Sequence, residues 1–213
     1  MSTLYSDSID PRFRFGDIIR GFATATPVIN NPPLASENIN FQIEVVRSGF
    51  YAVLSPCCSI NENIVVLCPL VQLRSTFLTN PYLVEDFNRI NRPMTPEQAV
   101  PPSLWERLPT HEKEKRKVVG FTYAFVELFV FSDHPMFPQY VLRARTGEIM
   151  ETRAYMVDFR QSFTVRCEKI TNNSTPFENV KLLQLSIEAR AELRNKMATF
   201  YSRVPEEDKV LAE

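Results

Sequence analysis

Phe15-Gly16-Asp17-Ile18-Ile19 opens the part of this chain that decides its fold. Two further stretches follow it, Ala52-Val53-Leu54-Ser55-Pro56 and Val65-Val66-Leu67-Cys68-Pro69-Leu70. Both are short, nearly continuous apolar runs, which are typical of strands that are buried on both faces. We therefore expect residues 15–72 to form the framework of a β domain.

Alternation and turn signals predict the other strands. Apolar and polar residues alternate over 39–45, which is the period of a half-buried strand. The predicted strands are 16–22, 39–45, 50–55, 64–70, one long bent strand over 118–131, 140–145, 148–159 and 163–168. Thr146-Gly147 indicates a hairpin turn. The prolines and paired asparagines of residues 23–38 predict a long loop.

Helical signals gather in two places. Residues 74–117 form a predicted helical insertion, in which Asn80 caps a helix that begins with Pro81. Residues 186–202 form a C-terminal helix with Ser186 as its N-cap, and Arg190, Arg194 and Lys196 lie off its apolar face. The first 14 residues read as a loose lead-in.

Composition excludes some classes of function. The 213 residues carry 24 basic and 25 acidic side chains, so no overall positive field favours nucleic acid. No stretch approaches the ~20 apolar residues of a membrane span, and no secretory signal is visible at the N-terminus. We expect one domain over residues 1–213, in the cytoplasm, with its four cysteines reduced.

The order and spacing of the opening stretches resemble the framework strands of the PemK/MazF toxin family, small barrels that cut RNA. The residues that carry the resemblance are Gly16-Asp17-Ile18, Val53-Leu54-Ser55 and Pro69-Leu70. It covers residues 15–72 and implies an SH3-like barrel. The expected fold class is therefore mainly β with α additions: barrel framework 15–72, helical insertion 74–117, further strands 118–170 and a C-terminal helix.

The residues that would cut RNA are missing from this pattern. The family uses an arginine before the second motif and a hydroxyl residue after the third, which stabilise the charged transition state and move protons. These positions fall on Gly49 and Val71. Arg47 lies two residues early, which displaces it by ~6–7 Å along a strand. The resemblance thus implies a scaffold kept for binding a protein partner rather than RNA, with no cofactor or metal and no specified oligomeric state.

Two enzymatic alternatives remain open. One is an endoribonuclease toxin with relocated catalytic residues, Arg47 with Ser55 or Gln72. The other is a cysteine-dependent hydrolase in which Cys57 or Cys58 is the nucleophile and His111 or His134 the base. Reduced structural thiols explain the cysteine pair more simply, and a zinc site that includes Cys68 lacks the usual ligand spacing.

Surface candidates for a partner are Trp105 and the apolar face of the C-terminal helix, formed by Leu193, Met197 and Phe200. Packing of that face on the protein's own barrel is the favoured alternative. Degenerate barrels of this kind resemble regulators in prokaryotic defence systems, including accessory proteins of CRISPR-linked protease modules such as type III-E. The resemblance therefore implies a sigma factor, its inhibitor or a protease substrate as partner.

Overall fold

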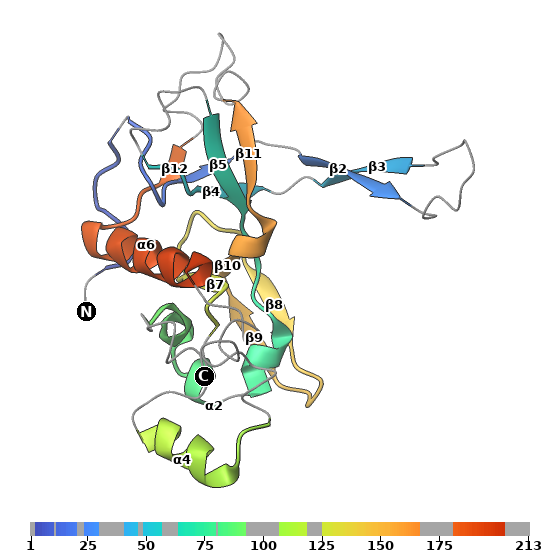
Figure 1. The fold of residues 1–213 in the computed structure, drawn as a ribbon, viewed down its shortest axis with the longest axis vertical. Helices are drawn as coiled ribbons and strands as arrows, with labels where there is room; N and C mark the ends of the chain where they lie inside the picture. Colours follow the sequence, from blue (N-terminus) through green and yellow to red (C-terminus); the bar gives the residue numbers. More distant parts are fainter. Residues whose placement is uncertain are drawn as a thin grey trace, which may run out of the picture.

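The computed structural model of the protein describes residues 3–10, 12–20, 24–29, 41–46, 49–56, 64–79, 81–92, 107–118, 125–166 and 181–202. These residues form antiparallel sheets with a few helices (Figure 1). The expectation of a mainly β fold with α additions is confirmed.

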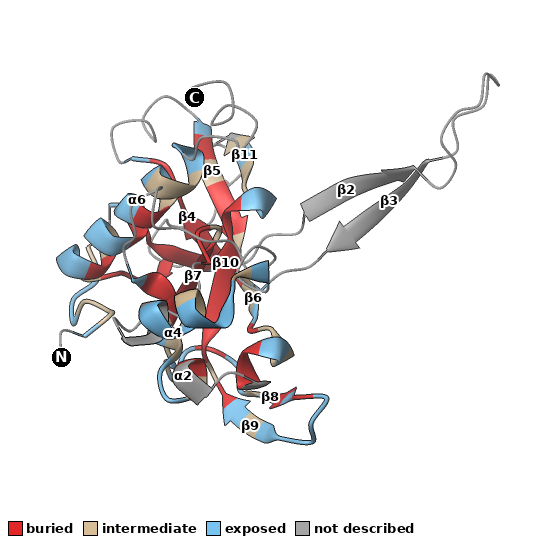
Figure 2. Ribbon diagram, turned by 60° about the horizontal axis from the view of Figure 1, so that its bottom comes forward, coloured by how far each residue is buried: buried red, intermediate tan, exposed pale blue. Residues whose placement is uncertain are grey.

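The largest sheet has five antiparallel strands in the order β11-β5-β4-β1-β12. Their bounds are β1 Ile18–Arg20, β4 Phe50–Val53, β5 Ile64–Pro69, β11 Phe163–Arg166 and β12 Lys181–Leu183. The strands expected from the three opening stretches, β1, β4 and β5, lie at the centre of the sheet. Figure 2 shows that the buried residues concentrate in β4, β5, β7 and β10.

A second sheet has the order β6-β10-β7, with bounds Val71–Gln72, Tyr155–Asp158 and Leu128–Phe131. Only Leu70 separates β5 from β6, and the 3₁₀ helix η4 (Phe159–Gln161) joins β10 to β11. Two antiparallel pairs, β5 with β11 and β6 with β10, therefore lead the chain from one sheet into the other. The main apolar core includes residues of both sheets and of the C-terminal helix.

Two hairpins complete the β structure. In one, β8 (Tyr140–Arg143) pairs with β9 (Ile149–Thr152) around the predicted Thr146-Gly147 turn, where Gly147 has a φ of 95°. In the other, β2 (Thr24–Ile29) pairs with β3 (Phe41–Val46) and extends away from the body of the protein (Figure 1).

One loop prediction and two strand predictions were wrong in part. Residues 24–29 form β2 although they were expected in a loop, because a two-stranded ribbon accepts the proline that a central strand would reject. Val118 ends helix α4 (Thr110–Val118), and β7 begins only at Leu128, because an apolar run does not by itself distinguish helix from strand.

The predicted strand 148–159 is divided into β9 and β10. Asp133 accepts hydrogen bonds from the Thr152 hydroxyl (2.8 Å) and the Arg153 amide (3.1 Å), and the Ala154 amide donates to the Thr152 hydroxyl. These local bonds turn the chain between a strand that pairs with β8 and a strand that pairs with β7.

The described helices of the insertion are short. They are η1 (Ser75–Thr79), α2 (Pro81–Val84), η2 (Phe87–Asn91) and α4. Asp86 caps η2 by accepting a hydrogen bond from the Asn88 amide at 2.9 Å. Asn91 binds the outer edge of β7, since its amide donates to Val130 O (2.7 Å) and accepts from Val130 N (2.6 Å).

The C-terminal helix α6 (Ile187–Tyr201) begins as predicted, with the Ser186 hydroxyl accepting from the Ala189 amide. Leu193 is fully buried, and Met197 and Phe200 pack against the same core. This face therefore covers the protein's own sheets, and Leu193 offers no surface to a partner in this structure. The expectation that Lys196 lies off the buried side was wrong, because its amine reaches the carbonyl of Ile90 in η2.

The N-terminal segment is not a loose lead-in. Tyr5 forms a β-bridge with Leu185, and its hydroxyl donates to Ser132 O at 2.7 Å. The Asp10 amide donates to the side chain of Gln184 at 3.0 Å. These contacts join the segment to the residues just before α6 and to Ser132, which follows β7.

Candidate functional site

The ladder of β4 and β5 ends next to the two positions to which the resemblance assigns RNA cleavage. Tyr51 pairs with Pro69 in the β4–β5 ladder, and the Leu70 amide donates to Phe50 O at 3.0 Å. Gly49 and Val71 are the residues next to this last hydrogen-bonded pair, but neither belongs to the ladder: Gly49 lies in a bend before β4, and Val71 begins β6, which pairs with β10. Neither residue has a charge or a hydroxyl group.

The proposed substitutes do not assemble there. The Ser55 hydroxyl is buried and accepts a hydrogen bond from the Val66 amide at 2.7 Å, so it connects β4 to β5. Gln72 is exposed on β6, six residues beyond Val66, which corresponds to roughly 20 Å along the strands. Arg47, Cys57, Cys58 and Trp105 lie outside the described residues, and their roles stay predictions.

Gly16 and Asp17, which are part of the first stretch that suggested the resemblance, have structural roles in this protein. Gly16 has a φ of 84°, and a Cβ on it would lie 2.7 Å from Leu185 Cδ1. Asp17 is fully buried, and its Oδ2 accepts from Lys181 Nζ and from the Arg14 amide, both at 2.7 Å. The positive φ and the close approach of Leu185 favour glycine at the first position, and the buried carboxylate at the second requires a cation.

Lys181 completes this buried ion pair. Its amine also donates to Asp10 O (2.8 Å), Arg12 O (3.0 Å) and Gln184 Oε1 (2.8 Å). Burial raises the pKa of Asp17 to about 6, although the hydrogen bond and charge of Lys181 act in the opposite direction. The carboxylate is therefore ionised at neutral pH and joins β1, β12 and the N-terminal segment.

A second charged group surrounds Asp158 at the end of β10. Arg160 donates to it from Nε (2.8 Å) and Nη2 (2.5 Å), and Arg74 Nη2 lies 3.1 Å away. Burial acts to raise the pKa of Asp158, but the bonds and charges of the two arginines outweigh it and lower the pKa below its ordinary value. Both arginines are thus engaged by one carboxylate where the two sheets meet.

The thiol and imidazole groups within the described residues are not arranged for catalysis. Cys68 is buried, donates to Asp158 O at 3.1 Å, and has its pKa raised to about 12 by burial. A thiol of this kind is a poor nucleophile at neutral pH. His134 packs edge-on against Tyr5 with ring centroids 4.8 Å apart, while Asp133 binds Thr152 and Arg153 instead of the imidazole. His111 lies on the exposed helix α4.

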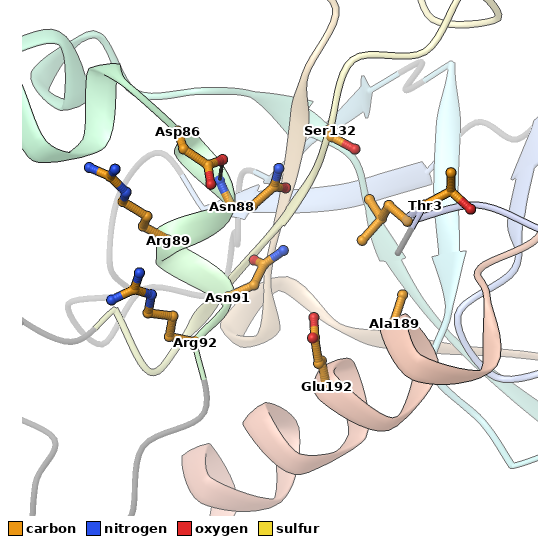
Figure 3. Close-up of a pocket in the computed structure, with 10 residues that line it drawn as sticks. Thr3, Asp86, Asn88, Arg89, Asn91, Arg92, Ser132, Ala189 and Glu192 are labelled. Atoms are coloured by element: carbon orange, nitrogen blue, oxygen red, sulfur yellow. Dashed lines mark hydrogen bonds between the residues drawn. The ribbon is translucent and has the colours of Figure 1, made fainter. Parts of the chain in front are cut away.

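A cavity of about 390 Å³ lies between η2, the N-terminal segment, the end of β7 and α6 (Figure 3). Glu192 extends from α6 toward the segment that carries Asn91. Three other polar side chains that line the cavity have partners within the protein: Asp86 caps η2, Asn91 binds β7, and Arg89 pairs with Glu85 at 2.6 Å. These contacts hold the neighbouring elements together, so we interpret the cavity as a polar gap between packed elements.

Within the ranges that the structure describes, no three His, Cys, Asp or Glu side chains are placed to hold a metal ion. None of the described helices has the length and apolar character needed to cross a membrane. No protein-family model matches the chain, and no curated protein and no solved structure matches it either.

Proposed function

We propose that this protein is a non-catalytic interaction or regulatory protein built on a degenerate PemK/MazF-like, SH3-like barrel. The observation that carries the proposal is that Gly49 and Val71, which adjoin the hydrogen-bonded Phe50 and Leu70, have neither a charge nor a hydroxyl group. The groups that would stabilise a charged phosphate and move its protons are therefore absent from both positions.

The connections between the sheets support the barrel. Strand pairs β5–β11 and β6–β10 pass from the five-stranded to the three-stranded sheet through Leu70 and η4, as bent strands do at the corners of small barrels. We place the protein in the cytoplasm of a prokaryote, in a defence or toxin-related system, with a protein partner such as a sigma factor, its inhibitor or a protease substrate.

An RNA-cleavage assay tests the proposal that the protein has no ribonuclease activity. The purified full chain is incubated with a mixed single-stranded RNA in the presence of a chelator, and the products are separated on a denaturing gel. We expect no fragments beyond those of the buffer. Metal-independent fragments that disappear in an Arg47→Ala or Gln72→Ala variant would overturn the proposal and establish the relocated nuclease.

Thiol labelling tests the hydrolase alternative. An activated thiolate reacts with a mild alkylating reagent within minutes at neutral pH. We expect the native chain to show slow labelling, with no labelling of Cys68 before denaturation. Fast, selective labelling of Cys57 or Cys58, lost in an alanine variant of His111 or His134, would support the hydrolase instead.

Binding is tested with purified products of the genes that neighbour this one, each titrated against the protein by calorimetry. We expect saturable binding of one such protein and no binding of single-stranded RNA. RNA binding without any protein binding would contradict the proposed role.

A further inference from the structure

Lys196 is a buried amine in the contact between α6 and η2. The residue is only 5% exposed, although lysine is almost never fully buried unless it is paired. Its amine donates to the Ile90 carbonyl of η2, and no carboxylate among the residues that the structure describes forms an ion pair with it. A charged amine here would have one neutral acceptor for its three N–H donors.

The charged groups around this end of α6 compensate Lys196 only weakly. Glu127, which lies just before β7, attracts the amine, but its effect is smaller than the penalty of burial. The other charged side chains on the elements packed there are exposed or have other partners, and they are Asp86, Arg89 and Arg92 of η2, Asp158 and Arg160 beside η4, and Glu192 and Arg194 of α6. The charged amine is therefore disfavoured in the packed helix.

This imbalance couples the position of the helix to pH. Burial lowers the pKa of Lys196 from 10.5 to about 7. When the helix end leaves η2, water solvates the amine and its ordinary pKa returns. The released state then binds the proton more tightly, so the packed state loses stability as the pH falls from about 10 to about 7 and loses no more below that range.

The last two turns of α6 have few other buried contacts. Leu193 is fully buried, whereas Met197 and Phe200 are half-buried where they pack against the core. The Phe200 ring lies beside Phe159 with ring centroids 5.8 Å apart. Segments with few buried apolar contacts open locally while the rest of a protein stays folded. The helix end can therefore separate from η2 while Leu193 keeps the first turns in place.

We propose that residues 196–201 of α6 form a pH-sensitive latch, in which charging of the Lys196 amine releases the helix end from η2. Release exposes the apolar side chains of Met197 and Phe200, which otherwise cover the core. The latch involves neither Gly49 nor Val71, so it does not depend on the proposed function.

Hydrogen exchange of the full chain at several pH values measures this opening. Each exchange rate is divided by the rate of an unstructured amide at the same pH, which gives a protection factor for peptides that cover residues 196–202. For the wild type we expect a protection factor about tenfold lower at pH 6 than at pH 8, and an unchanged one between pH 5 and pH 6, where Lys196 is already charged. Peptides that cover β4 report on the core and should not show this decrease.

Two substitutions of Lys196 separate charge from size. Lys196→Met removes the titrating group, so the helix end should stay protected, with a change of less than about twofold between pH 5 and pH 8. Lys196→Arg keeps its charge at every pH, so protection should be low throughout this range. Lys115→Met, on the exposed helix α4, is the control and should behave like the wild type.

Three results would overturn the latch. One is a wild-type helix end with equal protection at pH 6 and pH 8, which can be measured whether or not the variants fold. Another is a pH dependence that persists in Lys196→Met. The third is a parallel decrease in the β4 peptides, because the helix would then open only when the whole protein unfolds.

Discussion

Lys181→Met removes the amine that neutralises Asp17 and keeps most of the aliphatic length of the side chain. Asp17 is fully buried, and its Oδ1 has no hydrogen-bond partner in the described structure. The amine, 2.7 Å from Oδ2, is thus the cation that permits an ionised carboxylate there. Because the charge of Asp17 depends on pH, the cost of the substitution must depend on pH as well.

The loss of stability in Lys181→Met follows from the pKa of Asp17, which burial raises from 3.8 to about 6 in the folded protein. The folded state therefore binds the proton more tightly, and the stability that this supplies below pH 3.8 is lost as the pH rises to about 6. Without Lys181 the pKa rises further, since buried unpaired carboxyl groups reach about 8 or 9. Above pH 6 the variant then continues to lose about 1.4 kcal/mol per pH unit while the wild type does not.

Urea denaturation from pH 5 to pH 8 measures this difference in the free energy of unfolding. We expect a cost of about 1–2 kcal/mol at pH 5, from the lost hydrogen bonds to Asp10, Arg12 and Gln184. At pH 8 the cost grows to about 4–5 kcal/mol, close to the cost of breaking other buried pairs. Lys115→Met, on the exposed helix α4, is the control. A cost that does not change with pH, or one below about 1 kcal/mol at pH 8, would refute the role assigned to this pair.

Two substitutions test local packing by thermal and urea denaturation. Gly16→Ala should lower the free energy of unfolding by about 2–4 kcal/mol, because it adds a Cβ at a positive φ and against a neighbouring side chain. Gly49→Ala, where a Cβ meets open space, should change it by less than about 0.5 kcal/mol, and equal effects would contradict the packing argument. Asn91→Leu should cost about 2–4 kcal/mol, since it leaves the buried N–H and C=O of Val130 unpaired; a neutral result would show that this edge of β7 finds other partners.

Local patterns were sufficient for several elements. The apolar runs located β4 and β5, Thr146-Gly147 located a hairpin, and Ser186 located the start of α6. In each case the signal lies within a few residues of the element. The division of 148–159 required Asp133, which is distant in the sequence, and could not be read from the strand itself.

Buried charges were missed because their partners are remote in the sequence. Lys181 lies in an apolar run and Asp17 lies beside apolar residues, which was a signal that each needs a partner. Lys196 was assigned to a polar face from helical periodicity alone. In the fold it reaches the Ile90 carbonyl, and burial lowers its pKa to about 7.

The amino-acid order alone was sufficient to predict that this chain is mainly β and that a helix begins after Ser186. Hydrophobic periodicity, turn residues and side-chain chemistry are local properties, so the sequence is sufficient to recognise them. Only the tertiary structure decided that Asp17 is neutralised by Lys181, that Asn91 binds the edge of β7, and that β2 pairs with β3. These facts depend on strand register and on contacts between distant segments, which are set by the packing of the whole core.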